Sequence, residues 1–332
     1  MNGCITRYLG GIELIFSNRT SLAPTFIATV FLVLAPFITY ASSASRESTT
    51  FNLSEIAPGI YLHEGIHVTF EHEQHDDIAN IGFIIGNKCI AVIDTGGSVS
   101  IGNSLLKSIQ KISDKPVCYV INTHVHFDHV LGNLPFLDEH PQFVGHENLK
   151  VAIKRNRSFF LKEYSNDLGP DPSEDSIIGP DLGVPNTKEL DLGGRKLLLT
   201  AYPTAHSYND LMILDQQTGT LWTGDLLFRE RIPSLTGSLK GWLDVMESFK
   251  TLNVTFVVPG HGTTAKNLAE AKADQQRYLD NLLRETRQAI ADGLFLDEVQ
   301  ERVGNDEKAH WLLHEQHHKA NVTKAFTELE WE

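Results

Sequence analysis

Apolar and polar positions in the first half of the chain predict strands followed by a helix and a further strand. The runs that predict strands are residues 59–63, 78–86, 89–97 and 117–122. The polar stretch 67–77 predicts a hairpin within an antiparallel meander. Apolar residues recur at helical spacing over residues 98–113, with Ser98 available as N-cap. The last run is almost wholly apolar, which is typical of a strand covered on both faces.

The second half repeats this style and adds helices at its end. The apolar runs that predict strands are residues 195–207, 209–215, 220–228 and 255–262. Helical spacing appears over residues 238–252 and again over the long segment 265–292, and a shorter His-rich helical tail follows. The pattern therefore predicts two strand-rich halves with external helices, and polar loops gathered along one edge.

The N-terminal segment differs in composition from the rest. An apolar core within residues 24–45 has arginines upstream and small residues downstream, which is the order of a cleavable secretory signal. We expect a signal peptide over residues 1–44 and export to the periplasm or the medium, with a retained membrane anchor as the alternative. Residues 45–332 predict one domain with a C-terminal helical extension over about residues 265–332.

Charge and cysteine content narrow the choice of partner and compartment. The net charge of −14 repels phosphate backbones, so nucleic acid is not expected as a substrate. Cys89 and Cys118 lie at the starts of two apolar runs that are expected to be neighbours. A disulfide between them is compatible with an oxidising compartment, yet two buried thiols are the favoured expectation.

The stretch INTHVHFDHVLGN, residues 121–133, concentrates metal-binding side chains directly after an apolar run. The carboxyl ends of strands in open α/β sheets are where ligands bind. Including the polar residues that end later runs, the candidate ligands are His124, His126, Asp128, His129, His206, Asp225 and His261. Seven ligands are too many for one tetrahedral ion but suit two ions that share a carboxylate and a hydroxide. Nitrogen and oxygen donors without thiolate favour two zinc ions, although iron or manganese would accept the set.

The spacing of the ligands indicates how they are divided between two ions. His124 and His126 alternate on an extended segment, so their side chains project the same way and grip one ion. Asp128 and His129 follow where the chain turns, and they aim at a second ion. Asp225 is the natural bridge because a carboxylate has two oxygens to distribute.

The motifs HVHFDH, TAHS, TGD and PGHG resemble the metal signature of the metallo-β-lactamase fold superfamily, over most of residues 55–265. The resemblance implies an α/β fold, specifically a four-layer αββα sandwich, in a metallo-β-lactamase-like hydrolase domain. It implies His124, His126 and His206 at the first metal, Asp128, His129 and His261 at the second, and Asp225 between them. Asp225 stands where Cys-containing zinc β-lactamases have a thiolate, which resembles glyoxalase II and lactonase-type hydrolases.

A finer resemblance extends to the end of the chain. EHEQHDDIANIGFIIG, GDLLFRERIPSLTGSLKGWL and NVTKAFTELEWE are similar to the quinoprotein relay system zinc metallohydrolases. These are exported bacterial proteins associated with periplasmic quinoprotein dehydrogenases and with sulfur-oxidation accessory hydrolases. The resemblance therefore implies a periplasmic location and a quinoprotein dehydrogenase as a partner.

These observations predict a dinuclear zinc hydrolase, in which a metal-bridging hydroxide attacks an ester, thioester, lactone or lactam of a small molecule. Asp128 is the candidate catalytic residue that orients the hydroxide. Asp94 is a candidate acceptor for a ligand imidazole N–H, with a turn or cap role as the alternative. His75, Lys240 and Trp242 are candidate substrate contacts, with a solvated loop, helix surface and core as their alternatives.

Other functions remain compatible with the sequence. A single-iron oxidoreductase of the persulfide dioxygenase type belongs to the resembled superfamily, although the complete second-site set argues against it. A metal-binding maturation factor for a quinoprotein is another alternative. HEQHH at residues 314–318 formally fits a helical zinc motif of metalloproteases, but no histidine follows it and a polar helix face is expected. The physiological substrate, the leaving group and the oligomeric state stay open.

Overall fold

In the computed structural model, which describes residues 51–332, the first sheet has seven strands in the order β1-β2-β3-β4-β5-β6-β7. They are β1 (Ser54–Ala57), β2 (Ile60–His63), β3 (Ile81–Ile85), β4 (Ile90–Ile93), β5 (Val117–Ile121), β6 (Gln142–His146) and β7 (Leu182–Val184). The strands β1 to β4 pair antiparallel, and β4 to β7 pair parallel. The change comes where α1 (Val99–Ile112) connects β4 to β5, because a parallel pair needs a crossover. Ser98 caps α1 as predicted, accepting a hydrogen bond from Ile101 N–H.

The second sheet has five strands in the order β12-β11-β10-β9-β8. They are β8 (Thr187–Asp191), β9 (Lys196–Ala201), β10 (Leu211–Asp215), β11 (Thr220–Trp222) and β12 (Phe256–Val258). The strands β8 to β11 pair antiparallel, whereas β11 and β12 are parallel and are joined through α4 (Leu239–Ser248). These strands and α4 match the apolar runs and the helical spacing that the sequence presents.

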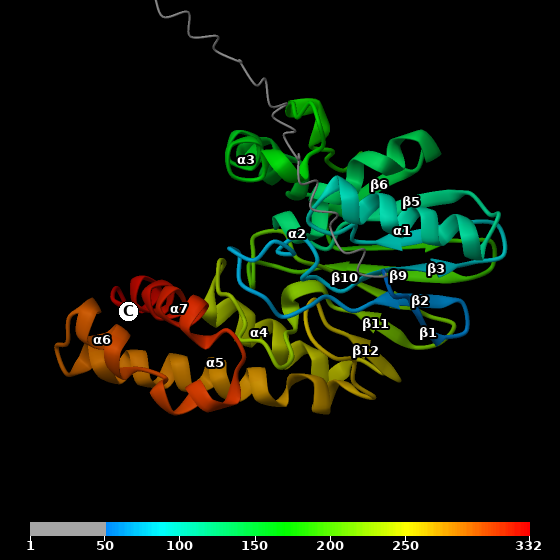
Figure 1. Cartoon of the computed structure of the whole chain (residues 1–332). Coiled ribbons are helices and arrows are strands. Elements are labelled where there is room, and N and C mark those ends of the chain that lie inside the picture. Colours follow the sequence, from blue (N-terminus) through cyan, green and yellow to red (C-terminus); the bar gives the residue numbers. More distant parts are fainter. Residues whose placement is uncertain (1–50) are drawn as a thin grey trace, which may run out of the picture. The chain divides into compact units, whose positions relative to one another are not determined.

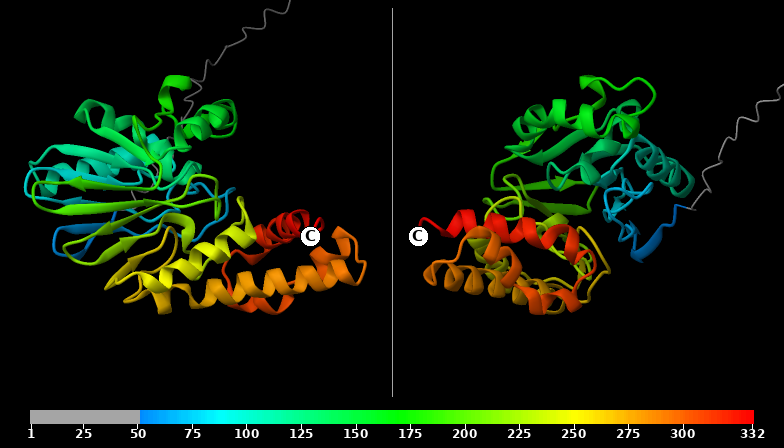
Figure 2. Two further views of the ribbon diagram at one scale, coloured as in Figure 1. Left: turned by 180° about the vertical axis from the view of Figure 1, so that it is seen from behind. Right: turned by 60° about the vertical axis from the view of Figure 1, so that its left-hand side comes forward.

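The two sheets pack face to face and helices cover their outer faces (Figures 1 and 2). On β4, Ile90 and Val92 pack with α1, while Ala91 and Ile93 pack toward the second sheet. Since successive side chains of a strand point to opposite faces, a wholly apolar strand is buried on both sides. The outer face of the second sheet packs against α4 and the C-terminal helices. The predicted αββα sandwich is confirmed.

Five further α-helices lie in the described part of the chain. They are α2 (Phe127–Val130), α3 (Leu149–Glu163), α6 (Leu296–Arg302) and α7 (His314–Leu329), and α5 (Leu268–Ala291) is the long helix predicted after residue 265. The helices α5 and α7 lie side by side (Figure 2). No helix of residues 51–332 is both long and apolar enough to cross a membrane. The expected signal peptide lies outside the described residues.

The polar stretch at residues 67–77 differs from the predicted hairpin. It forms consecutive turns, in which His72 N–H donates to Thr69 O and His75 N–H donates to His72 O. The flanking strands β2 and β3 pair directly with each other. The stretch therefore has no strand of its own and serves as a loop beside the sheet.

Cys89 and Cys118 form a disulfide, which corrects the prediction of two thiols. The parallel strands β4 and β5 pair Ile90 with Val117 and Ala91 with Tyr119, so Cys118 lies at an irregularity in the register. Its Cα is 5.7 Å from that of Cys89. That distance lies within the range of disulfides. The apolar pattern predicted the two strands but not this register.

The His-rich tail is buried, which corrects the prediction of a polar helix face. His314, His317 and His318 all lie in the interior face of α7. His318 Nε2 donates to Val303 O, and its Nδ1 is 3.0 Å from the Tyr278 hydroxyl on α5. The packing of α7 on α5 therefore gives these rings a structural environment. In the part of the chain that the structure describes, they belong to no group of potential metal ligands.

Candidate metal centre

The seven candidate ligands come from strand ends of both sheets. His124 and His126 follow β5, and Asp128 and His129 lie in the short helix α2. On the second sheet, the loops after β9, β11 and β12 carry His206, Asp225 and His261. The edges of the two sheets thus bring ligands far apart in the sequence to one place, as the sequence predicted.

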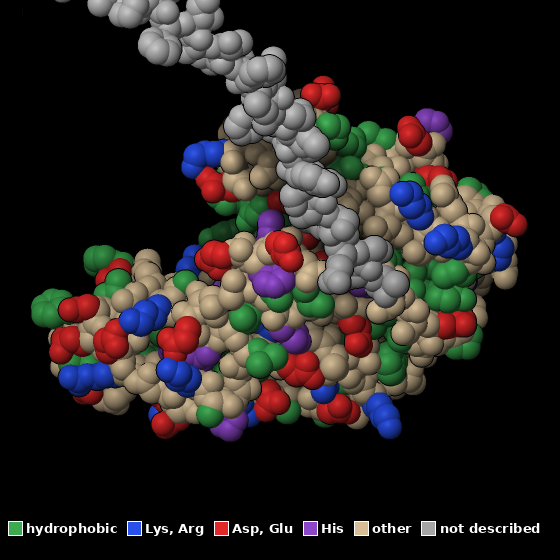
Figure 3. All heavy atoms as spheres, viewed as in Figure 1, with side chains coloured by type: hydrophobic (Ala, Val, Ile, Leu, Met, Phe, Trp, Pro, Cys, Tyr) green, Lys and Arg blue, Asp and Glu red, His purple; other side chains and the backbone are tan. Residues whose placement is uncertain are grey.

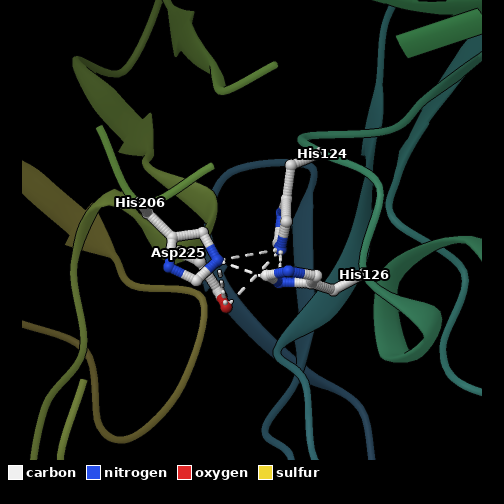
Figure 4. Close-up of side chains that lie close together, drawn as sticks. All are labelled: His124, His126, His206 and Asp225. Carbon is white, nitrogen blue, oxygen red and sulfur yellow. Dashed lines mark hydrogen bonds and ion pairs between the residues drawn. The ribbon is translucent and has the colours of Figure 1, made fainter. Parts of the chain in front are cut away.

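Three imidazole nitrogens converge at the first group, with Asp225 beside them (Figure 4). His126 Nδ1 lies 2.9 Å from both His124 Nε2 and His206 Nε2, and the latter two atoms are 3.3 Å apart. Asp225 Oδ2 is 3.3 Å from His206 Nε2 and 3.6 Å from His124 Nε2. Tetrahedral Zn–N bonds of about 2.0–2.1 Å place ligand nitrogens about 3.3 Å apart. The four atoms are therefore spaced as ligands of one ion.

Asp225 joins the first group to a second one, formed by Asp128, His129 and His261. Asp225 Oδ1 is 3.2 Å from His129 Nε2 and 3.3 Å from His261 Nε2. Asp128 Oδ2 is 3.5 Å and 3.3 Å from the same two nitrogens. One oxygen of Asp225 thus faces each group, which is the arrangement of a bridging carboxylate.

Backbone carbonyls fix the orientation of two ligand rings. His206 Nδ1 lies 2.7 Å from Ser234 O, and His261 Nδ1 lies 2.7 Å from Ile78 O. A carbonyl can only accept a hydrogen bond, so Nδ1 carries the proton in both rings and Nε2 keeps its lone pair. The lone pairs point into the two groups, ready to bind a cation.

Asp94 holds two further rings. Its Oδ2 accepts from His129 Nδ1 at 2.8 Å and from Thr123 Oγ1 at 2.8 Å. Because the Thr123 hydroxyl donates its proton to Asp94, its oxygen accepts a hydrogen bond from His124 Nδ1 at 3.1 Å. One buried carboxylate thus orients a ligand of each group. Sequence reasoning left a turn role open for Asp94, and the structure places it against a ligand imidazole.

Buried atoms without partners test whether this site fits a metal. His129 Nε2 and Asp225 Oδ1 are both buried, and neither has a hydrogen-bond partner among residues 51–332. Such atoms are costly in a folded protein unless another group satisfies them. A cation between them would satisfy both, and the set of nitrogen and oxygen donors suits a divalent transition metal. The residues therefore fit a metal centre.

Charge is concentrated at this site. Burial raises the pKa of Asp225, but His261 and His129 outweigh that effect and hold the pKa well below its usual range. Burial lowers the pKa of His206 to about 3. Burial also opposes protonation of His129, yet Asp225 and Asp128 hold its pKa well above the usual value. The ionised carboxylates attract a cation, and a metal ion bound there would take the place of the proton that they favour on His129.

A model of the metallo-beta-lactamase superfamily matches residues 76–261, more than half of the chain. The chain belongs to the metallo-β-lactamase superfamily. Membership confirms the predicted superfamily resemblance and the prediction of a metal-dependent hydrolase. The bounds of the match begin just before β3 and end at the ligand His261, so the matched region contains every candidate ligand.

Relatives of this superfamily protein support the same assignment. A probable metallo-hydrolase from Methanocaldococcus jannaschii is 27% identical over 208 residues, covering 58% of this chain and 91% of the relative. One from Streptococcus pyogenes serotype M6 is 23% identical, covering 59% and 84%. A beta-lactamase-like protein 2 homolog from Caenorhabditis elegans is 24% identical over 200 residues. That match spans 60% of each of the two chains.

Solved structures of the superfamily share the fold. A metallo-beta-lactamase from Pontibacter korlensis superimposes with a TM-score of 0.57 at 18% identity, covering 69% of this chain and 99% of that one. DIM-1 metallo-beta-lactamase superimposes with a TM-score of 0.54 at 13% identity, covering 69% and 96%.

A cavity of about 290 Å³ opens beside the metal centre of this superfamily member. The ligands His126, Asp128, Asp225 and His261 line it. Its other walls come from the loop at Phe70, from α2 and α3, from the loop after Asp225 and from α7. Aromatic side chains dominate this lining, and they are Phe70, Phe127, Phe159, Phe160, Tyr164 and Phe228. Figure 3 shows hydrophobic side chains in the hollow between the region of α3 and the C-terminal helices.

The predicted substrate contacts on α4 require correction. Lys240 Nζ forms an ion pair with Glu332 at 2.7 Å. Trp242 is fully buried, where its Nε1 donates to Leu226 O and its ring packs against His206 at 5.2 Å. Neither belongs to the residues that line the cavity. Helix α4 turns these side chains toward the chain terminus and the core, so Trp242 supports a ligand ring from behind.

His75 lies behind the cavity wall. Its Nε2 is 3.0 Å from Asp167 Oδ2, and its ring is tilted against Phe127 and Tyr164 at 6.3 Å from each. His75 is not among the cavity-lining residues. The residue of the polar loop that does line the cavity is Phe70, which sequence reasoning missed.

Sequence reasoning also missed Arg231, on the loop after Asp225, and His317, on α7. Both line the cavity. Arg231 Nη2 is 3.4 Å from His317 Nε2. Burial and the neighbouring Arg231 lower the pKa of His317 to about 4, so this imidazole is neutral and accepts. Arg231 lies six residues after Asp225 in the sequence, but no local pattern indicated that it would contact α7.

Proposed function

We propose that the chain is an exported dinuclear zinc hydrolase that cleaves an acyl bond of a small molecule. Esters, thioesters, lactones and lactams are the bonds that this chemistry opens. The observation that carries the proposal is the pair of ligand groups that share Asp225, with one carboxylate oxygen directed at each.

The residues at the centre have distinct roles in this proposal. His124, His126 and His206 would hold one zinc ion, and Asp128, His129 and His261 the other, with Asp225 shared. Two such ions would lower the pKa of a bridging water to about 7, so that it could act as a hydroxide near neutral pH. They would also polarise the carbonyl of the substrate.

Asp128 contributes orientation at the cavity floor. Burial raises its pKa, but His129 and His261 outweigh that effect and hold the pKa below its usual range, so the carboxylate is ionised. It can therefore accept a hydrogen bond from the attacking water and direct the oxygen lone pair toward the acyl carbon. Asp94 keeps the His129 ring in place from the other side.

We propose that the enzyme acts in the periplasm, beside a quinoprotein dehydrogenase, and the likeness to quinoprotein relay system zinc metallohydrolases supports this. The signal-like composition of residues 1–44 supports export. The disulfide between Cys89 and Cys118 is consistent with an oxidising compartment. We infer that the substrate is a small molecule, because α3 and α7 contribute walls to a cavity of about 290 Å³ and the net charge opposes nucleic acid.

Metal content and acyl hydrolysis test the proposal together. The protein is purified from the periplasm of cells supplied with zinc and iron, and its metals are measured by mass spectrometry. We expect about two zinc ions per chain, and cleavage of at least one substrate in a panel of activated esters, thioesters and lactones. Asp128→Ala should abolish cleavage. A single iron ion would instead favour the oxidoreductase, and a fully zinc-loaded protein inactive on the whole panel would favour a maturation factor.

A further inference from the structure

The segment of residues 233–240, which leads into α4, binds the ligand residue His206 at its backbone and at its ring. The His206 carbonyl oxygen accepts from Thr236 Oγ1 at 2.6 Å and from Gly237 N–H at 2.7 Å. On the ring, Nδ1 donates to Ser234 O at 2.7 Å. The Nε2 lone pair therefore keeps its direction toward the first ligand group only while this segment stays in place.

The C-terminal helix α7 holds the beginning of this segment through Asn321. This side chain is only 1% exposed, and its Oδ1 accepts from Leu235 N–H at 2.8 Å. Its Nδ2 donates to Pro233 O at 2.7 Å. A backbone N–H can only donate and a carbonyl can only accept, so these two contacts determine which way round the amide lies. Asn321 therefore binds the backbone on both sides of Ser234.

One peptide group connects Asn321 to the ligand ring. Leu235 N–H and Ser234 O belong to the same peptide group, which is planar, and in the trans form they point in opposite directions. Asn321 binds one side of this rigid unit at 2.8 Å, and His206 Nδ1 binds the other side at 2.7 Å. Rotation of the peptide plane would break both hydrogen bonds, and polarisation along the chain of bonds strengthens each of them. The direction of Ser234 O therefore depends on Asn321, and the orientation of the His206 ring follows it.

Helix α7 also binds the end of the segment, through Glu328. Its carboxylate accepts from Leu239 N–H at 2.7 Å and from Ser238 Oγ at 2.8 Å, where α4 begins. Asn321 and Glu328 are seven residues apart, which is about two helical turns, so both project from the same face of α7. Helix α7 lies beside α4 (Figure 2) and thus holds the segment at both ends.

We propose that Asn321 is a positioning residue of the metal centre, which sets the His206 ring through the Ser234–Leu235 peptide group and so raises the affinity of the first ligand group for zinc. The inference rests on the proposed zinc centre. It adds a part of the chain that lies beyond residues 76–261, where the superfamily match ends. The C-terminal extension thereby becomes part of the metal centre, although Asn321 itself is not a ligand.

A purely structural role of Asn321 has to be separated from this one, because Nδ2 also donates to the Tyr278 hydroxyl on α5 at 2.9 Å. Tyr278→Phe is the matched control, since it removes this contact between α7 and α5 but leaves the contacts to Pro233 and Leu235. Both Tyr278→Phe and Asn321→Ala should lower the melting temperature. Only Asn321→Ala should change zinc binding.

Competition with a chromogenic chelator measures the two zinc-binding steps of the full-length protein. In Asn321→Ala we expect one step to weaken about tenfold and the other to stay unchanged. Asn321→Asp should keep the wild-type affinity, because a buried carboxylic acid is protonated and can accept from Leu235 N–H and donate to Pro233 O. Wild-type affinity in Asn321→Ala, or an equal loss at both steps, would overturn the proposal.

Hydrogen exchange of the wild type gives a second test that does not depend on the folding of a variant. Because coupling between two sites is reciprocal, zinc binding should slow exchange of the Leu235 amide by a larger factor than that of the Val257 amide. The Val257 amide is the reference, since it donates to Ala265 O in the second sheet. Equal factors at the two amides would contradict the proposal. Absence of zinc from the wild type would overturn the proposed function as well, so the two failures are told apart.

Discussion

At the residue scale, Asp94 shows how one side chain fixes a metal centre from behind. Its φ of 52° lies in the left-handed region, which Asp and Asn tolerate better than most residues. Oδ1 accepts from Thr123 N–H, and Oδ2 accepts from Thr123 Oγ1 and from His129 Nδ1. The strained turn therefore aims a single carboxylate at rings of both ligand groups.

Replacement of Asp94 by Asn should weaken metal binding with little effect on the backbone. The amide that replaces one oxygen confronts a donor with a donor, at His129 or at Thr123, so the ligand ring loses its fixed orientation. We expect zinc affinity to fall about 10–100-fold. Competition with a chromogenic chelator measures it. Asp138→Asn, on the exposed surface of the chain, is the control, and equal affinities in the two variants would show that Asp94 does not position the ligand.

The gathering of the candidate metal ligands was predictable from the sequence, and the lining of the cavity beside them was not. His124 and His126 are two residues apart on an extended segment, so local geometry alone places them together. Lys240 and Trp242 are close to Asp225 in the sequence, but the orientation of α4 directs them elsewhere. Arg231 and His317 meet only because α7 folds back over the cavity, and no local pattern encodes that contact.

At the element scale, the disulfide fastens β4 to β5, the strand that leads into the metal centre. Cys89 and Cys118 are 29 residues apart, and a closed loop of that length stabilises the fold by about 3–4 kcal/mol in the chain-entropy account. We expect a reductant to lower the urea midpoint of the wild type correspondingly. The double variant Cys89→Ala/Cys118→Ala should start at the lower midpoint and ignore the reductant. A wild type that is equally insensitive would contradict this contribution.

A buried ion pair joins β10 to the first sheet. Arg195 Nε and Nη2 donate to the two oxygens of Asp215, at 2.9 Å and 2.8 Å, and Nη1 donates to Ile85 O and Pro58 O. Asp215→Asn leaves the guanidinium buried without its counter-ion, so the free energy of unfolding should fall by about 3–5 kcal/mol. Urea unfolding near neutral pH measures this. The apolar double variant Arg195→Met/Asp215→Leu should recover most of the loss.

The same pair predicts part of the acid sensitivity. Burial raises the pKa of Asp215, but hydrogen bonds from Arg195 and Thr218 outweigh that effect and lower the pKa below its usual value. The pair's stabilisation is therefore present above the unfolded-state pKa of about 3.9, and is lost as pH falls through the folded-state pKa. The stability gap between wild type and Asp215→Asn should narrow over that acidic range. A gap that stays constant with pH would contradict this assignment.

Secondary structure followed from the apolar pattern where that pattern was long and regular. The spacing over residues 98–113 predicted α1, and the wholly apolar runs predicted β4 and β5. The disulfide and the buried histidines of α7 depend instead on register and on helix–helix contact. A sequence read one segment at a time has no access to either relation.

At the scale of the whole molecule, the metal centre joins the two halves of the sandwich. The first sheet carries His124, His126, Asp128 and His129, and the second carries His206, Asp225 and His261. The sequence predicted that these ligands share one edge, because strand ends gather there. It could not predict that α3 and α7 would enclose the space above them, since that enclosure depends on how the outer helices pack.

Metal removal should therefore weaken the whole fold as well as abolish activity. A ligand bound only by the folded state adds RT ln(1 + [L]/Kd), which is about 4 kcal/mol at a thousandfold excess over Kd. Metal removal also leaves the ionised carboxylates of Asp128 and Asp225 side by side in the interior. We expect a chelator to lower the melting temperature, and zinc to restore it.

Asp225→Ala separates the effect of the metal from a direct effect of the chelator. This variant loses the shared ligand of both groups, so it should melt at the lower temperature from the outset and ignore the chelator. A wild type whose melting temperature is the same with and without zinc would mean that the two halves are held by their apolar core alone. The metals would then act only in chemistry, and the ligands at the sheet edge would add nothing to the stability of the sandwich.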